Sequence, residues 1–409
     1  MSLKLLLFYF IGFIILYLEP VSIGGVTFGI LWKLVLMFFI TLPILHDSFR
    51  KKQIELFVFF SILFAIKTLV SYSSFEYIVT TLTIFIKGLM LPILYLFFIN
   101  KMKKETLTFI AKHFSILIIL SFIPYVLGLI EPLAEGYDLS AYGLDGQYGL
   151  IGPFINPHSA SISVAFSMII VTFQIKKTNK HLENLFYLLI LAFGFYALLL
   201  TYVRTGLTIY VIILFYLYLQ NINLKKVLLI IMSMFILTAG TIYLFETSEV
   251  VRMRLEDKNK YVDKGEVGSG RVTFWKTAVN NWLNDDFSVI FIGLGEEYGK
   301  DKMEKVVGLR IFAHNEFFQT LQQEGLIGLI IFLLSLFYLN RFIKNYQKSN
   351  YYLVTRVIFL GLITEMMFQG GFYFNIVLLL SIYLALIKKE FLEQTQINMK
   401  AYNYVNQNK

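Results

Sequence analysis

The sequence predicts an all-α protein that crosses a membrane about twelve times, and three observations support this fold class. Hydrophobic residues make up 57% of the 409 residues, whereas soluble domains contain just under half. Charged residues make up only 15%, and the mean hydropathy is +0.68. Finally, lysine and arginine gather in alternate loops between the apolar runs. An ordinary soluble enzyme is therefore excluded.

Twelve apolar runs are long enough to span a bilayer. They cover residues 3–18, 26–45, 54–70, 77–99, 107–130, 158–175, 183–202, 205–220, 224–245, 322–340, 352–369 and 371–387. The first run carries Lys4 near its start, as a signal peptide does. Because Glu19-Pro20 follows where small cleavage-site residues are expected, we predict a retained span.

Basic residues indicate the orientation of these spans. One set of alternate loops and span ends contains Arg50, Lys51, Lys52, Lys101, Lys103, Lys104, Lys176, Lys177, Lys180, Lys225, Lys226, Arg341, Lys344 and Lys348. The opposite short loops contain only Arg204 among basic residues. By the positive-inside rule, both termini are expected in the cytoplasm. Membrane topology thus accounts for the net charge of +9, and nucleic-acid binding is not expected.

Two loops on the expected outer side are longer than a connection requires, and such loops often carry function. Residues 131–157 contain acidic residues, tyrosines and glycines. Residues 246–321 contain two of the three tryptophans, Trp275 and Trp282. The segment RVTFWKTAVNNWL, from Arg271, has apolar residues at helical spacing. It predicts an amphipathic helix at the outer surface or folded over the bundle.

These loops suggest a division of the chain into two parts. Residues 1–150 are expected to form the first five spans and an outer loop. Residues 151–409 are expected to form the remaining membrane domain. The second part includes the large extracytoplasmic loop 246–321, between the ninth and tenth spans.

Two arginines on the expected outer side are candidates for anion binding. Arg204 lies in TYVRTGLT between two spans, where it either reaches the lipid headgroups or binds an anion inside the bundle. Arg271 follows the glycine-rich stretch GEVGSG and begins the predicted amphipathic helix. An arginine beside a helix N-terminus suits phosphate oxygens. The alternative for Arg271 is a solvated loop arginine.

His314 lies where the long loop re-enters the membrane, and it is the candidate catalytic residue. A neutral imidazole there could act as a general base near pH 7. The supporting candidates, which could orient or polarise the ring, are Asn315, Glu316 and Glu324. The alternative is an interfacial histidine that caps the tenth helix.

Other polar residues lie in or beside the apolar runs. His158 follows Asn156-Pro157, which fits a helix start, and it is a further supporting candidate. Charged residues inside the runs usually face the bundle interior or water. They are Lys33, Lys67, Lys87, Arg356 and Glu365. Glu365, with Gln369, lies near the outer end of its span and could reach the same site.

The sequence lacks the motifs of several function classes. It contains no cysteine, which excludes disulfides, thiolate metal sites and cysteine nucleophiles. It has no HExxH zinc motif, no GxxxxGK[ST] phosphate loop and no glycine-rich dinucleotide fingerprint in a βαβ context. We therefore expect no metal site, no cofactor and a substrate that arrives already activated.

Five segments resemble, in order, motifs of the O-antigen polymerase and ligase family of bacterial envelope glycan enzymes. They are GPFINPHSAS, TYVRTGLT, GSGRVTFWKTAV, IGLGEEYG and AHNEFFQTLQQEGLIGL. The last segment is the most specific. The resemblance extends from about Gly152 to the last span, and the first 150 residues match only as hydrophobic spans.

This resemblance implies an inverting, metal-independent glycosyl transfer on the outer face of a bacterial cytoplasmic membrane. The implied donor is an undecaprenyl-diphosphate-linked oligosaccharide. The family's catalytic histidine falls on His314, and its two diphosphate-binding arginines fall on Arg204 and Arg271. No family role passes to His158, because the family often has an asparagine there.

Three functions remain open. The first is a polymerase that joins oligosaccharide repeat units into a capsule, O-antigen or exopolysaccharide. The second is a ligase that transfers glycan to a lipid or other acceptor. The third is a transporter or flippase, although two related halves would then be expected. For the polymerase, the implied partners are the prenyl-linked oligosaccharide, membrane lipids, a chain-length regulator and a flippase.

Overall fold

Helices make up most of the structure, as the apolar runs predict. The computed structural model describes residues 3–23, 26–50, 54–70, 78–136, 148–219, 271–308, 310–370 and 373–407. The helices are α1 Leu3–Leu18, α2 Phe28–Arg50, α3 Leu56–Val70, α4 Ile78–Lys101, α5 Lys104–Leu120, α6 Ile123–Val126, α7 Pro157–Lys177, α8 His181–Leu200, α9 Arg204–Leu219, α12 Arg271–Leu283, α13 Phe287–Ile292, α14 Gly295–Val307, α15 Glu316–Asn345, α16 Tyr352–Phe368 and α17 Phe374–Gln407. A short antiparallel hairpin, β1 Ser22–Ile23 and β2 Val26–Thr27, joins α1 to α2.

The predicted helical membrane fold is confirmed in its main feature. Within the described residues, five helices are long and apolar enough to cross a membrane. They lie at Ile84–Lys101, Lys104–Val126, Pro157–Lys176, His181–Leu200 and Glu316–Asn345, and shorter apolar helices accompany them. The predicted ninth span, 224–245, lies outside the described residues, so the total of twelve stays a prediction.

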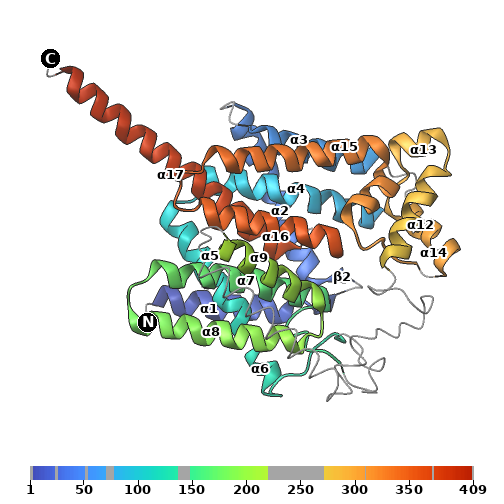
Figure 1. The fold of residues 1–409 in the computed structure, drawn as a ribbon, viewed down its shortest axis with the longest axis horizontal. Helices are drawn as coiled ribbons and strands as arrows, with labels where there is room; N and C mark the ends of the chain where they lie inside the picture. Colours follow the sequence, from blue (N-terminus) through green and yellow to red (C-terminus); the bar gives the residue numbers. More distant parts are fainter. Residues whose placement is uncertain are drawn as a thin grey trace.

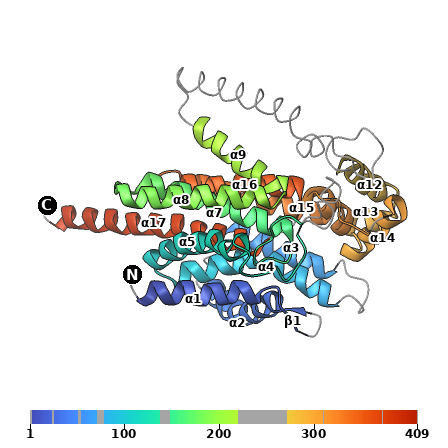
Figure 2. The same cartoon turned by 90° about the horizontal axis from the view of Figure 1, so that it is seen from below.

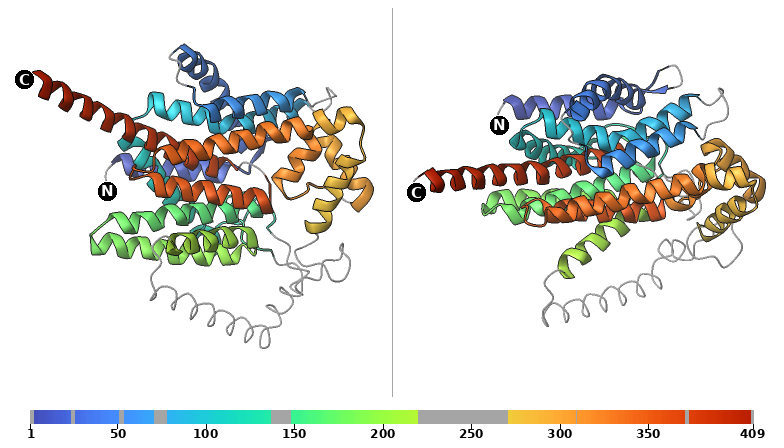
Figure 3. Two further views of the ribbon diagram at one scale, coloured as in Figure 1. Left: turned by 45° about the horizontal axis from the view of Figure 1, so that its top comes forward. Right: turned by 90° about the horizontal axis from the view of Figure 1, so that it is seen from above.

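The long helices run side by side, and the two ends of the bundle differ (Figure 1). Both termini lie at one end, and α12, α13 and α14 cover the other (Figures 2 and 3). The termini therefore lie at the end of the bundle opposite the segment from Arg271. Which end faces the cytoplasm stays a prediction.

Helix α7 lies at the centre of the bundle and α8 at its periphery. In their apolar windows, 78% of α7 is buried but only 28% of α8. Small residues such as Ser161 and Ser163 let neighbouring helices approach α7 closely. At Gly206 of α9, an added methyl group would overlap the Ser161 backbone. Large apolar side chains on α8, including Leu182 and Leu189, are exposed, as a lipid-facing surface requires.

The predicted amphipathic helix is confirmed as α12, which begins at Arg271. Its buried Ala278 packs with Met303 of α14 and with Ala313, and Phe274, Val307 and Phe318 surround this small core. Trp275 and Trp282, the two tryptophans of the long loop, also take part in packing. The Trp282 indole donates to the Ile290 carbonyl at 2.9 Å, and the Trp275 ring lies 5.9 Å from that of Phe318.

Two glycines fix how these helices meet α15. Helix α13 ends at Gly293 (φ 75°, ψ 169°), and α15 is kinked at Gly325 (φ 66°, ψ −173°). This backbone region is essentially confined to glycine. A methyl group on Gly293 would overlap the Gln323 carbonyl, and one on Gly325 would press on Phe291. The segments IGLGEEYG and EGLIGL therefore pack backbone to backbone.

We predict that Gly293→Ala destabilises the protein more than Gly308→Ala. Both glycines have positive φ, but no atom of the described residues lies within 4 Å of a methyl group added at Gly308. The Gly308 variant should cost only about 1–2 kcal/mol of backbone strain, whereas the Gly293 variant adds a steric overlap. Thermal unfolding in detergent measures the difference. Equal melting temperatures for the two variants would contradict the close contact.

Candidate active site

A cavity of about 530 Å³ lies at the meeting point of both predicted parts of the chain. One side is formed by the segment after α1 and by α2, α3 and α4, and the other by the start of α7, α15 and the segment after α16. His158, His314, Glu316 and Glu324 all line it. The structure thus brings the candidate base together with three of its four predicted supporting residues.

His314 is held in an unusual backbone conformation at the edge of this cavity. Its φ of 52° is in the left-handed region, which is uncommon for a residue other than glycine. Its ring centroid lies 6.0 Å from that of Phe274 on α12. Its Nδ1 lies 3.5 Å from Nε2 of Gln369, the residue that follows α16. Side chains from two directions therefore orient the imidazole.

The surroundings of His314 favour its neutral form. Burial, and secondarily the positive charge of Arg271, lower the pKa of His314 from 6.5 to about 4. Because both effects disfavour the imidazolium ion, the ring is neutral at pH 7. Arg271, the first residue of α12, is therefore close enough to act electrostatically on the candidate base.

Asn315 caps α15, the role that the sequence left open for His314. Its side-chain oxygen accepts hydrogen bonds from the backbone N–H groups of Phe317 and Phe318, at 3.0 and 3.2 Å. Its Nδ2 donates to the Met367 carbonyl at 3.0 Å. Asn315 thereby ties the start of α15 to the end of α16 and fixes the backbone next to His314.

His158 faces the same cavity from the first turn of α7. Helix α7 begins at Pro157, as predicted, and Asn156 caps it by accepting the N–H of His158 at 2.8 Å. The Nδ1 atom of His158 is buried, and no described residue forms a hydrogen bond with it. Both His314 and Arg271 act electrostatically on the ring. His158 is thus close to both candidate functional residues.

A polar stripe along α15 forms one wall of the cavity. Glu316, Gln319, Thr320, Gln323 and Glu324 all line it, and Glu324 is buried deeper in the bundle. There Nζ of Lys67 lies 3.6 Å from Glu324 and also donates to the Ile292 carbonyl. The sequence analysis missed Gln319 and Gln323. Their helical spacing from Glu316, in an otherwise apolar span, was the signal that could have identified them.

The first part of the chain supplies charged groups to the opposite wall. Lys33 of α2 forms an ion pair with Glu19, and both residues line the cavity. Lys87 of α4 also lines it. Lys33 was predicted to face the bundle interior or water, and Lys87 either to do the same or to snorkel toward the membrane surface; both line the cavity. Their place beside His314 was not predicted.

Arg204 lies at the N-terminus of α9, and its side chain is exposed. It is not among the residues that line the cavity. Gly206, two residues later, packs against Ser161, three residues after His158. Arg204 and His158 therefore belong to closely packed helix ends, but the structure does not bring Arg204 into the cavity. Its role as a diphosphate ligand stays a prediction.

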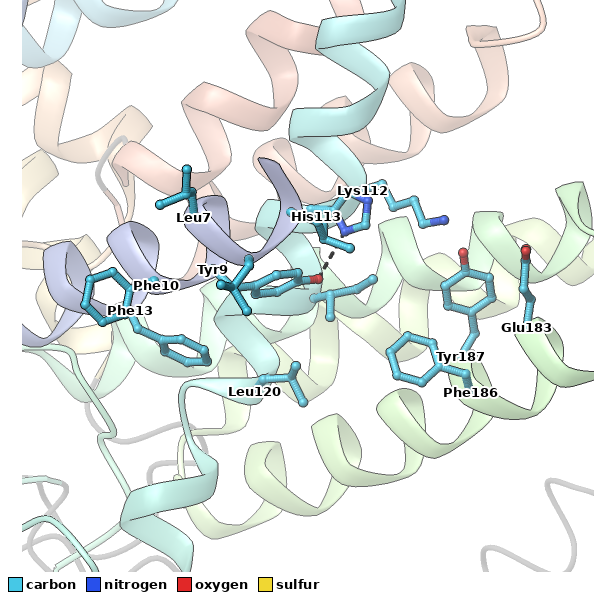
Figure 4. Close-up of a pocket in the computed structure, with 13 residues that line it drawn as sticks. Leu7, Tyr9, Phe10, Phe13, Lys112, His113, Leu120, Glu183, Phe186 and Tyr187 are labelled. Carbon is cyan, nitrogen blue, oxygen red and sulfur yellow. Dashed lines mark hydrogen bonds between the residues drawn. The ribbon is translucent and has the colours of Figure 1, made fainter. Parts of the chain in front are cut away.

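A second cavity, of about 820 Å³, shares no lining residue with the first. It lies among α1, α5 and α8, and its lining is mainly apolar (Figure 4). The Tyr9 hydroxyl lies 3.1 Å from Nδ1 of His113, and Nζ of Lys112 lies 5.3 Å from the Tyr187 ring centroid. We take the first cavity as the candidate site because it combines His314 with the nearby cation Arg271.

Some predicted features lie outside the described residues. These are the glycine-rich stretch GEVGSG, the first part of the loop 246–321, and residues 137–147 of the first outer loop. Among the described residues, no group of three or more His, Asp or Glu side chains is placed to hold a metal ion.

The comparisons with known proteins agree with the resemblance of the motifs. The model of the O-antigen ligase family matches residues 188–333. This range contains Arg204, Arg271, the two packed glycine segments and His314. No curated protein matches the chain. The match covers about a third of the chain, and over that segment the protein is similar to the O-antigen ligase family.

Proposed function

We propose that the protein is a membrane glycosyltransferase that joins oligosaccharide repeat units into a surface polysaccharide. Its substrate is an undecaprenyl-diphosphate-linked oligosaccharide, and the reaction takes place on the outer face of a bacterial cytoplasmic membrane. The observation that carries this proposal is a partly buried, neutral His314 that lines a cavity between apolar helices, with the cation Arg271 near the ring. The family match supports a glycan-transferring enzyme of the ligase or polymerase type.

The donor's diphosphate is the leaving group. As the bond between the anomeric carbon and the diphosphate oxygen breaks, its electron pair stays on the diphosphate. The growing negative charge needs cations in a site with little water. In this proposal, the guanidinium groups of Arg271 and Arg204 bind the phosphate oxygens with paired N–H donors. Arg204 would reach the diphosphate from the neighbouring helix end.

His314 is the base for the acceptor. A hydroxyl oxygen of the acceptor sugar attacks the anomeric carbon, and the hydroxyl proton passes to the imidazole. A neutral ring is required, which the lowered pKa of His314 supplies. Attack opposite the leaving diphosphate inverts the anomeric configuration. Glu316, Gln319 and Gln323 could accept or donate hydrogen bonds to the other sugar hydroxyls.

The membrane setting suits this substrate. A prenyl chain must reach the site laterally through the bilayer, and large apolar side chains are exposed on the outer helices, including α1 and α8. Both termini would lie in the cytoplasm, and α12–α14 on the opposite side. A flippase that delivers the substrate and a chain-length regulator would be its partners. The reaction would need no metal, since the diphosphate already activates the donor.

A ligase is the second candidate, because the matching family is described as an O-antigen ligase. It would use the same donor and the same base. Only the acceptor differs: a finished lipid or other molecule in place of another repeat unit.

We predict that loss of the protein removes the long glycan ladder while single repeat units remain on their anchor. Glycan electrophoresis of a deletion strain complemented with wild type or His314→Ala tests this. The His314→Ala protein should insert normally and fail to restore the ladder. Accumulation of full-length glycan on the prenyl carrier would identify a ligase. An unchanged glycan profile would contradict both functions.

We predict that Arg271→Lys lowers activity by about tenfold or more. Lysine keeps the charge but cannot make the paired contacts of a guanidinium. Polymer formation by the purified variant in detergent measures the effect. Arg310→Lys is a matched control, because Arg310 binds Glu297 and Asp301 and does not line the cavity. Normal polymer yield from Arg271→Lys would remove Arg271 from the site.

We predict an unusually acidic lower limit for catalysis. Only neutral His314 accepts a proton, so kcat/KM should stay constant down to about pH 5 and fall as the pH passes through about 4. An ordinary histidine would already lose activity near 6.5. Removing the charge in Arg271→Gln should raise the pKa of His314 and move this limit upward. A wild-type limit near 6.5 would show that His314 is not the base or is not buried.

A further inference from the structure

Gln369 is the polar side chain in contact with the imidazole of His314. Its Nε2 lies 3.5 Å from Nδ1 of the ring. Its Oε1 is buried and has no hydrogen-bond partner among the described residues. A buried carbonyl oxygen without a partner is costly, so this arrangement leaves a hydrogen bond unmade.

The two ends of the amide can exchange places. A half-turn of the side-chain amide puts oxygen where nitrogen was, and the heavy-atom positions hardly change. The amide oxygen then faces Nδ1 and can accept its proton, which supplies the missing partner. An N–H of glutamine pointing at Nδ1 would instead place the ring proton on Nε2.

The backbone holds Gln369 in this place. Its N–H donates to the Glu365 carbonyl at 2.9 Å and ends α16, and the next residue, Gly370, has a φ of 79°. Asn315 binds the Met367 carbonyl from the start of α15. The residues on either side of the contact are therefore fixed to each other, independently of the contact itself.

We propose that Gln369 is a positioning residue: its side-chain oxygen accepts the Nδ1 proton of His314 and keeps the Nε2 lone pair free. The proposal deepens the proposed function and rests on it for the catalytic consequence. The acceptor hydroxyl then gives its proton to Nε2. The Nδ1 proton stays on the ring and remains hydrogen-bonded to the side-chain oxygen of Gln369. The resulting imidazolium donates from both nitrogens, and Gln369 stabilises it without taking the proton.

Glu365 provides the second partner. It lies one turn before Gln369 on α16 and is completely buried. Within the part of the chain that the structure describes, neither of its carboxyl oxygens has a hydrogen-bond partner. Residues four apart share one face of a helix. Once the amide oxygen turns to His314, its nitrogen is free to donate toward this carboxyl.

The first test reads the imidazole proton directly and needs no activity. The chain has five histidines, so labelling them with ¹⁵N and comparing wild type with His314→Ala identifies the signals of His314 by NMR. At pH 7 the proton should be on Nδ1. In Gln369→Leu it should move to Nε2 or be shared, whereas Gln369→Glu should keep it on Nδ1. Gln323→Leu, a glutamine of the same cavity, should leave the His314 signals unchanged.

The second test measures kinetics with the full-length protein. Gln369→Leu should lower kcat about tenfold or more, with little change in KM. Gln369→Glu should retain activity, because a carboxylate also accepts the Nδ1 proton. It should shift the acid limit of the pH profile upward by about one unit. Arg271, His158, Glu316 and Glu365 also act on the site, and they are unchanged in both variants.

The outcomes separate the two proposals. A wild-type proton on Nε2, or an unchanged proton position in Gln369→Leu, overturns the role of Gln369. Normal kcat in Gln369→Leu overturns it as well. If the NMR results are as expected but wild type forms no glycosidic bond from a prenyl-diphosphate donor, the contact stands and the proposed function fails.

Discussion

The close approach of Gly293 and Gly325 shapes the end of the bundle that α12, α13 and α14 cover. Helix α15 has to break at Gly325, since no side chain fits between it and Phe291. The break sets the direction of the first turns of α15, which carry Glu316, Gln319 and Gln323. It also brings α13 against α15, and α12 and α14 then pack around the small core of Ala278 and Met303. Arg271 and His314 meet as a result of this packing.

The chemistry of the cavity follows from the burial of its polar groups and from the charge of Arg271. A buried imidazole beside Arg271 is more stable without its proton, so the ring is ready to accept one. An anionic substrate at Arg271 would reduce that positive charge and make the ring more basic when the acceptor is in place. Burial thus keeps the His314 imidazole neutral before the substrate binds. The negative charge of the substrate would then raise the basicity of this imidazole for the proton transfer.

Local patterns predicted the elements well, and they predicted the contacts between distant elements less well. The start of α12 at Arg271 and the start of α7 at Pro157 follow from helical spacing and from proline chemistry. From the sequence, Asn315 could be either a helix cap or a partner of His314. The hydrogen bonds that its side-chain oxygen accepts from the Phe317 and Phe318 N–H groups show that it is a helix cap. Arg204 matches its motif, yet nothing in the sequence reveals that its side chain lies outside the cavity lining.

Local sequence patterns could not predict that Lys33, Glu19 and Lys87 line the same cavity as His314. This arrangement depends on packing between helices that are hundreds of residues apart in the chain. It has a consequence for how such a protein can diversify. The proposed catalytic groups come from the region matched by the family model, but the wall opposite them comes from residues before it. Substitutions in that wall can reshape the space available to a glycan and leave the proton acceptor and the cations untouched. In the proposed function, selectivity for the glycan and the chemistry of transfer would therefore belong to separate stretches of one chain, and each stretch could change independently of the other.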